Sequence, residues 1–264
     1  MTVLAGVLGH PVAHSRSPAM HNAAFRALGL DWRYVKLPVP PSLFGETVRA
    51  LEGSGYRGAN VTIPHKEAAL EVSDEATAPA RQIGAANTLT FADGRVLADN
   101  TDAGGLLDAL AEDPSGWRCL ILGAGGAGRA AAWALRGAGA AEVSVWNRTP
   151  GRAAALAREL GVRHAASVVT DVDLLVNATS VGLDPATDPA DALACLGLRG
   201  ADPPPRLADL VYGPEPTALQ AWAARAGARV VDGLEVLVRQ GARSFEAWTG
   251  SKAPVETMRK AASN

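Results

Sequence analysis

Cysteine is scarce in this sequence, whose 264 residues include only Cys119 and Cys195. The two lie far apart and form no Cys-x-x-Cys pair, which argues against a disulfide framework and a structural zinc site. We therefore expect both to be buried apolar residues. Histidine does not predict a metal site either, because His10, His14 and His21 span a strand-to-helix boundary and share no helical face.

An excess of charge of either sign is also lacking. The chain has 25 Lys and Arg residues against 27 Asp and Glu residues. This balance gives no electrostatic reason to expect nucleic acid or an anionic membrane as a partner, and it favours small-molecule ligands.

Long apolar runs are absent as well. No segment approaches the roughly 20 apolar residues that a membrane-spanning helix needs. The first residues, MTVLAGVLGHPVAHS, lack the basic region that opens a secretory signal. We expect a cytoplasmic protein.

The sequence does contain a regular alternation of short strand-like runs and longer helix-like runs, which is typical of an α/β protein. Crossovers of this length predict a mostly parallel sheet. In the first part of the chain, strands are expected at 3–9, 32–39 and 59–63, and helices at 17–30, 42–53 and from Pro64 onward. Ser17 and Asp102 are expected to cap helices, and Asp93-Gly94 is expected to turn a hairpin between 88–91 and 96–98.

A second unit is expected after the loop at 112–116, with five short strands and intervening Ala-rich helices, as in a doubly wound dinucleotide-binding domain. The five strands are expected at 118–122, 142–146, 173–178, 207–211 and 228–231. The chain after Gly233 is expected to be helical and to pack back on the first domain. We predict domains at 1–103, completed by 236–264, and at 104–235.

A glycine motif follows the strand at 118–122 directly and opens a helix. Gly123, Gly125 and Gly128 have the G-x-G-x-x-G spacing of a dinucleotide site, in which the backbone approaches a pyrophosphate at a helix N-terminus. The next strand ends in Asn147-Arg148-Thr149 rather than in the carboxylate typical of NAD sites. Two guanidinium groups, from Arg148 and Arg152, predict a 2′-phosphate and hence NADP; the alternative is an ordinary solvated helix start.

Uncharged polar residues gather near the strand ends of the first domain, where open α/β sheets bind ligands. They are Ser15, Ser17, Asn60, Thr62, Asn87, Thr88, Asn100 and Thr101, with Asp102. Singly, each is better explained as a cap or turn residue; together they suit a small polyhydroxylated ligand. Lys66 is unusual, because it opens a helix where the macrodipole favours Asp or Glu.

The motifs HSRSP, GANVTIPHK, GAANT, NTD, GAGGAG, NRT, NATSVG, YGPEPT and LVRQGARSF occur in the order found in shikimate dehydrogenases. The chain resembles that family over nearly its whole length. The resemblance implies an N-terminal substrate domain and a Rossmann-type NADP-binding domain, and NADPH-dependent reduction of 3-dehydroshikimate to shikimate in aromatic amino acid biosynthesis.

The resemblance also implies residue roles. Lys66 and Asp102 resemble the catalytic pair. The implied substrate-binding residues are Ser15, Ser17, Thr62, Lys66, Asn87, Asp102, Tyr212 and Gln240. The implied cofactor-binding residues are Gly123, Ala124, Gly125, Gly126, Ala127, Gly128, Asn147, Arg148, Thr149, Arg152, Thr179, Leu210 and Gly233.

Several alternatives stay open at this point. Quinate or an amino-substituted analogue could be the substrate, and the chain could be a non-catalytic NADP-binding regulator. No metal is expected, and the sequence leaves a homodimer open.

Overall fold

The computed structural model describes residues 2–264 and divides into two compact units. The first unit comprises Met1–Gly105 and Leu237–Asn264, and the second comprises Leu106–Val236. The chain passes from one unit to the other within helix α5 (Asp102–Leu110) and returns within helix α10 (Gly233–Thr249). No helix formed by residues 2–264 is long and apolar enough to cross a bilayer.

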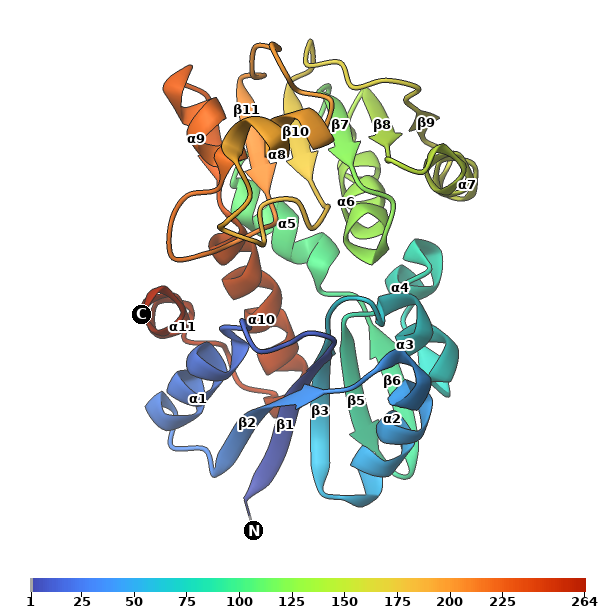
Figure 1. The fold of residues 1–264 in the computed structure, drawn as a ribbon. Coiled ribbons are helices and arrows are strands. Elements are labelled where there is room, and N and C mark those ends of the chain that lie inside the picture. The colour runs from blue at the N-terminus through green and yellow to red at the C-terminus, as the bar shows by residue number, and fades with distance from the viewer. Residues whose placement is uncertain (1) are drawn as a thin grey trace. The chain divides into compact units, whose positions relative to one another are not determined.

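The first unit contains a mixed sheet in the order β2-β1-β3-β5-β6-β4 (Figure 1). Strand β1 (Val3–Gly9) pairs in parallel with β2 (Trp32–Pro38) and β3 (Tyr56–Val61). Strands β5 (Thr88–Ala92) and β6 (Arg95–Asp99) form the predicted antiparallel hairpin, and β5 also pairs antiparallel with β3. The short β4 (Glu75–Ala76) was not predicted, because two residues carry no periodicity.

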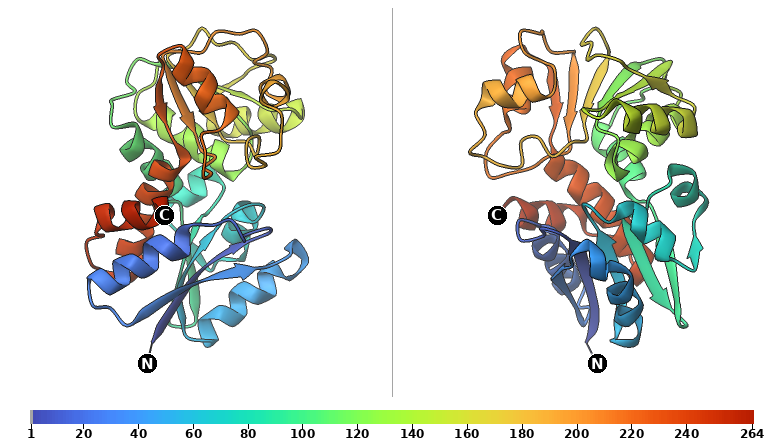
Figure 2. Two further views of the ribbon diagram at one scale, coloured as in Figure 1. Left: turned by 60° about the vertical axis from the view of Figure 1, so that its left-hand side comes forward. Right: turned by 45° about the vertical axis from the view of Figure 1, so that its right-hand side comes forward.

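Helices cover this sheet because each has one apolar face. The helices of this unit are α1 (Ser17–Ala27), α2 (Phe44–Gly53), α3 (Lys66–Val72), α4 (Ala78–Ile83), the later part of α10, and α11 (Val255–Ser263). The 3-10 turn Pro41–Leu43, directly before α2, buries none of its residues. Helix α11 lies beside α1 (Figure 2), and Arg16 donates a hydrogen bond to the Ala262 carbonyl at 3.1 Å. The predicted return of the C-terminal helices to the first domain is therefore confirmed.

One expected helix start and two expected helix caps are wrong in detail. Helix α3 begins at Lys66 rather than Pro64, because the His65 N–H donates to the Thr62 carbonyl at 3.0 Å and closes a separate turn. Ser17 lies inside the first turn of α1 and makes no capping bond; its own N–H donates to the Ser15 hydroxyl at 3.3 Å.

The expected cap of α5 is also wrong. The Asn100 side-chain Oδ1, rather than the Asp102 carboxylate, accepts from the Ala103 N–H at 3.3 Å. The Asp102 carboxylate is instead engaged by Lys66 and Asn87. A cap is thus provided from two positions upstream, which leaves the Asp102 side chain available for chemistry.

The second unit contains a wholly parallel sheet in the order β12-β11-β10-β7-β8-β9. This is the doubly wound order, with the reversal between β7 and β10, and it confirms the predicted Rossmann-type fold. The strands are β7 (Arg118–Leu122), β8 (Glu142–Trp146), β9 (Arg163–His164), β10 (Leu174–Asn177), β11 (Arg206–Asp209) and β12 (Arg229–Val231). The helices are α6 (Gly126–Gly137), α7 (Pro150–Leu160), α8 (Pro189–Cys195) and α9 (Ala218–Arg225).

Apolar residues cover both faces of the second sheet, as a parallel sheet requires. Cys119, on β7, belongs to this core, and burial raises the pKa of its thiol to about 12. Cys195 is exposed, so the expectation that both cysteines are buried is wrong. Helix α8 buries only Ala192, and Cys195 falls outside the face that packs inward.

His21, on α1, lies in the core of the first unit and has no exposed surface. Its ring stacks on Tyr34 with centroids 4.4 Å apart, and neither ring nitrogen has a hydrogen-bond partner among the described residues. Burial lowers the pKa of His21 to about 3. The nearby Asn60 side chain raises this pKa by less than burial lowers it, and it forms no hydrogen bond with either ring nitrogen. The folded protein therefore holds a neutral imidazole here.

We expect His21 to make stability depend on pH. Its pKa is about 3 when folded against 6.5 for the free side chain, so between these values only the unfolded state binds the proton. The contribution of the neutral His21 ring to the free energy of unfolding is complete above pH 6.5. It falls as the pH drops toward 3, by at most about 1.4 kcal/mol per pH unit. Urea unfolding across this range should show a steeper loss for the wild type than for His21→Phe; parallel curves would contradict the assignment.

Candidate functional site

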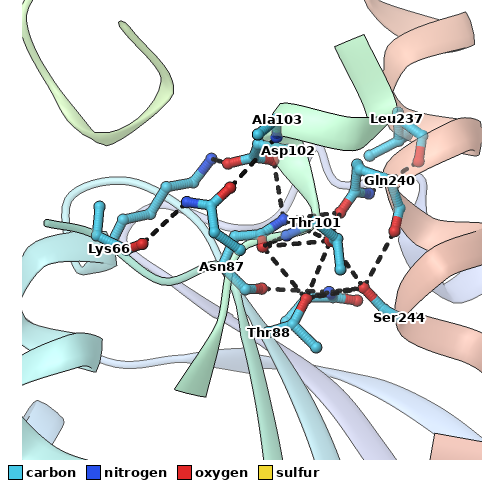
Figure 3. A network of polar contacts seen from close by, with 12 residues as sticks. Lys66, Asn87, Thr88, Thr101, Asp102, Ala103, Leu237, Gln240 and Ser244 are labelled. Carbon is cyan, nitrogen blue, oxygen red and sulfur yellow. Dashed lines mark hydrogen bonds and ion pairs between the residues drawn. The ribbon is translucent and has the colours of Figure 1, made fainter. Parts of the chain in front are cut away.

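The polar residues of the first unit meet at one edge of its sheet. Parallel strands β1 and β3 end at this edge, and the antiparallel hairpin places the start of β5 and the end of β6 there too. Side chains from four separate stretches of sequence are thereby brought together. Figure 3 shows the central part of this cluster.

Lys66 and Asp102 form the ion pair of the site. The Lys66 ammonium donates to the Asp102 carboxylate across 2.5 Å, and their side chains are only 13% and 16% exposed. An ion pair this far from solvent costs desolvation energy that a surface pair avoids, so its retention points to a use other than stability. The Lys66 carbonyl also accepts from the Ala86 N–H at 2.8 Å, which ties the start of α3 to the residue before Asn87.

Asn87 connects Asp102 to the rest of the cluster. The Thr101 N–H donates to Asn87 Oδ1 at 2.7 Å, which sets the amide so that Nδ2 points to Asp102 Oδ1 at 2.8 Å. Asn87 Nδ2 also lies 3.0 Å from Gln240 Oε1 on α10. Gly105 permits this approach of α10, since a Cβ there would lie 2.7 Å from the Gln240 backbone nitrogen.

Ser15 and Thr62 lie in the loops that follow the parallel strands, and Ser17 lies in the first turn of α1. Ser15 and Ser17 are buried after β1, and Thr62 is half-buried directly after β3, where its N–H donates to the Leu8 carbonyl at 2.9 Å. Asn60 lies within β3 and is buried in the hydrogen-bonded cluster. Asn60 is therefore part of the polar cluster.

The glycine motif of the second unit adopts the geometry of a dinucleotide loop. Gly123 has φ +110°, and a Cβ on Gly128 would lie 2.1 Å from the Gly123 carbonyl oxygen. A Cβ on Gly125 would have no atom within 4 Å, so the backbone is open there at the N-terminus of α6. These residues fit a bound pyrophosphate, which needs close backbone approach and a helix N-terminus.

The residues after β8 are linked to that loop. Asn147 Oδ1 accepts from the Ala124 N–H at 3.2 Å, and Asn147 Nδ2 donates to the Thr149 carbonyl at 3.0 Å. Arg148 and Arg152 are exposed at the start of α7. Guanidinium groups at this strand end fit the 2′-phosphate of NADP better than the 2′-hydroxyl of NAD.

The remaining sequence-predicted residues of the second unit lie beyond the carboxyl ends of its strands. Thr179 follows β10, Leu210 and Tyr212 follow β11, and Gly233 begins α10. A Cβ on Gly233 would lie 2.6 Å from the Leu210 carbonyl oxygen, so these two positions are neighbours. Tyr212 belongs to the second unit, whereas the other predicted substrate ligands belong to the first.

Asn177 and Asp209 organise these loops and were missed from the sequence. Asp209 is fully buried and accepts from Asn177 Nδ2 at 2.8 Å and from the Thr217 hydroxyl at 2.5 Å. Burial raises the pKa of Asp209 to about 6, although these bonds and one from the Val211 N–H oppose the rise. Both residues end buried strands, which is the sequence signal that could have identified them.

Among residues 2–264 no group of three or more His, Cys, Asp or Glu side chains is arranged to hold a metal ion. The first-unit site consists of a lysine, a carboxylate, amides and hydroxyls. A lysine paired with a carboxylate can move a proton to or from an oxygen, and amides and hydroxyls can hold neighbouring hydroxyl groups.

Three family models match the chain. A shikimate dehydrogenase substrate binding domain matches residues 7–89, a shikimate / quinate 5-dehydrogenase model matches 106–183, and a shikimate 5′-dehydrogenase C-terminal domain matches 233–262. A relative from Methanopyrus kandleri, shikimate dehydrogenase (NADP(+)), is 45% identical over 98% of this chain and 94% of its own length. The chain belongs to the shikimate dehydrogenase family.

Solved structures of this family share the whole fold. Shikimate 5-dehydrogenase from Thermus thermophilus, in complex with NADP(H) and shikimate, has a TM-score of 0.87 and 43% identity, covering 99% of this chain and 98% of that one. Ligand-free 5-ketofructose reductase from Gluconobacter has a TM-score of 0.83 and 32% identity, with the same coverage. A likeness of fold alone therefore does not select the substrate.

Proposed function

We propose that this protein reduces 3-dehydroshikimate to shikimate with NADPH, as part of aromatic amino acid biosynthesis. The observation that carries the proposal is the Lys66 and Asp102 pair, withdrawn from solvent inside a cluster of amides and hydroxyls, in a chain of the shikimate dehydrogenase family. We assign substrate binding to the first unit, which matches the substrate-binding model, and NADP binding to the second.

Lys66 would supply the proton that the ketone oxygen needs as it becomes an alcohol. NADPH, when bound, supplies the hydride. Asp102 orients the Lys66 ammonium, and its remaining lone pairs can accept from a substrate hydroxyl. The ammonium also stabilises the negative charge that develops on the oxygen, which acts on the transition state more than on the ground state.

The other first-unit residues would bind the ring. We assign the substrate carboxylate to the Ser15 and Ser17 hydroxyls, and the substrate hydroxyls to Thr62, Asn87 and Gln240. The family resemblance also implies Tyr212 as a substrate ligand. These assignments rest on the family resemblance and on the positions of the side chains at the ligand-binding edges of the two sheets.

Oxidation of shikimate with NADP⁺, followed by the absorbance of NADPH, tests the activity. The panel should include quinate, an amino-substituted analogue and 5-ketofructose, each assayed in the appropriate direction with both NADP and NAD cofactors. We expect shikimate with NADP⁺ to have the highest kcat/KM. A folded protein that binds NADP⁺ but turns over no substrate would instead indicate the non-catalytic regulator.

Arg148 is expected to determine the preference for NADP over NAD. Replacing it with alanine removes a guanidinium group from the strand end expected to hold the 2′-phosphate, so the Kd for NADP⁺ should rise by about tenfold to a hundredfold, while the Kd for NAD⁺ should change little. Arg158→Ala, on helix α7, is the matched control because its side chain is also exposed and lies ten residues farther along the chain. Titration of nucleotide into each variant measures both constants.

An Arg148→Ala variant that keeps its NADP⁺ affinity would leave the ordinary solvated helix start as the better account of this residue. The cytoplasmic location and a homodimer stay predictions. Light scattering on the purified protein over a range of concentrations measures the second directly.

A further inference from the structure

Behind Asn87 lies a buried group of polar side chains that the proposed chemistry does not use. Its centre is Ser244, on α10, which is fully buried. The Ser244 hydroxyl lies 2.8 Å from Asn60 Nδ2, 2.8 Å from Thr88 Oγ1 and 3.1 Å from Thr101 Oγ1 (Figure 3). One serine on the C-terminal helix thus meets strand β3, strand β5 and the residue before Asp102.

The orientations of the two amides in this group are set by their backbone partners. Asn60 Nδ2 lies 3.2 Å from the Asn87 carbonyl, which can only accept, so Asn60 Oδ1 must face Tyr34, whose hydroxyl donates to it at 2.8 Å. Asn87 Oδ1 accepts from the Thr101 N–H, so its Nδ2 faces Asp102. Both amides therefore present a donor on the side toward Asp102.

The hydroxyls between the amides can be aligned in the same direction. Ser244 accepts from Asn60, and its single proton can point to Thr88 at 2.8 Å instead of to the Gln240 carbonyl at 3.1 Å. Thr88 donates to Asn87 Oδ1 at 3.2 Å. Hydrogen bonds that point one way polarise each other, which strengthens the last donor in the series. Here the last donor is Asn87 Nδ2, bonded to the carboxylate that pairs with Lys66.

We propose that Ser244 is a positioning residue for the reaction: its hydroxyl completes a directed series of hydrogen bonds from Tyr34 through Asn60, Thr88 and Asn87 to Asp102. The series holds the Asp102 carboxylate, and through it the Lys66 ammonium, in the arrangement needed for proton transfer. This inference rests on the proposed function. It extends that function to a residue on α10 that would touch neither substrate nor cofactor.

The test is a double-mutant cycle on the full chain. Ser244→Ala removes the central hydroxyl, and Tyr34→Phe removes the first donor while keeping the ring that stacks on His21. We expect kcat for shikimate oxidation to fall about tenfold in Ser244→Ala and about threefold in Tyr34→Phe. Because Ser244→Ala removes the two 2.8 Å bonds between Asn60 and Thr88 and leaves only a direct contact of 3.3 Å, the double variant should also lose only about tenfold.

The KM for NADP⁺ should not change, since the series lies entirely in the first unit. Thr249→Ala is the matched control: Thr249 also lies on α10, and its hydroxyl donates to the Phe245 carbonyl four residues earlier, as Ser244 can to Gln240, but it contacts no member of the series. Thr249→Ala should keep the wild-type kcat. Thermal unfolding of each variant separates lost activity from lost folded protein.

Two results would overturn the role of Ser244. One is a Ser244→Ala enzyme whose kcat matches that of the Thr249→Ala control. The other is a double variant in which the two losses multiply, because independent effects would mean that no series connects the residues. A wild-type protein that is folded but inactive toward shikimate would overturn the proposed function itself, and with it this role; the wild-type assay therefore distinguishes the two failures.

Discussion

Replacing Lys66 with methionine is expected to lower kcat for shikimate oxidation by about a thousandfold. Methionine keeps much of the apolar length of the lysine side chain but can neither donate a proton nor carry charge. The ketone oxygen would then become negative without a neighbouring cation. Steady-state kinetics with saturating NADP⁺ measure the loss.

The fold should survive this substitution. Asp102 loses its ion-pair partner but keeps the hydrogen bond from Asn87 Nδ2, which is 2.8 Å long in the wild-type protein. Lys260→Met, at an exposed position on α11, is the matched control and should retain full activity. A Lys66→Met enzyme that keeps its kcat and shows only a raised KM would make Lys66 a binding residue rather than the proton donor.

Alanine substitutions at Gly128 and Gly125 are expected to have different effects: the first should lower stability, and the second should weaken NADP⁺ binding. A Cβ on Gly128 would lie 2.1 Å from the Gly123 carbonyl oxygen, a backbone atom that cannot yield without moving the loop. We expect Gly128→Ala to lose about 3 kcal/mol of stability in the second unit. Thermal or urea unfolding measures this loss without any assumption about ligand.

Gly125 provides the comparison within the same loop. Its backbone has φ −94° and ψ −171°, which alanine adopts without strain, and its Cβ would have no neighbour within 4 Å. Gly125→Ala should therefore fold normally, but its methyl group would occupy the space where a pyrophosphate approaches the backbone, raising the Kd for NADP⁺ by about tenfold to a hundredfold. Equal stability losses in both variants, or undiminished NADP⁺ binding by Gly125→Ala, would count against this arrangement of the loop.

The elements predicted most accurately are those with a local signal. The hairpin at Asp93-Gly94 and the strand before Gly123 were predicted because turn residues and apolar runs are read over a few neighbouring residues. The two-residue strands β4 and β9 were missed, since they exist only because a longer strand lies beside them. A helix cap was wrongly assigned where a side chain found a distant partner, as at Asp102.

In the candidate site too, residues with a local sequence signal were predicted, whereas contacts between distant residues were not. Asn87, Asp102 and Gln240 were identified through motifs, but their mutual contacts join positions up to 153 residues apart. Ser244 was missed, although it lies four residues after Gln240 and so on the same helical face. That spacing alone could not show whether the face meets solvent or a buried amide.

By itself, the sequence determined the succession of strands and helices, the dinucleotide loop and the membership of a family, because periodicity, glycine spacing and ordered motifs are properties of neighbouring residues. Only the tertiary structure decided that the Lys66 ammonium meets Asp102, and that Ser244 rather than solvent completes the polar cluster behind it. A buried hydrogen bond needs two partners at about 3 Å, and only folding brings together groups from β3, β5, α5 and α10 at that distance.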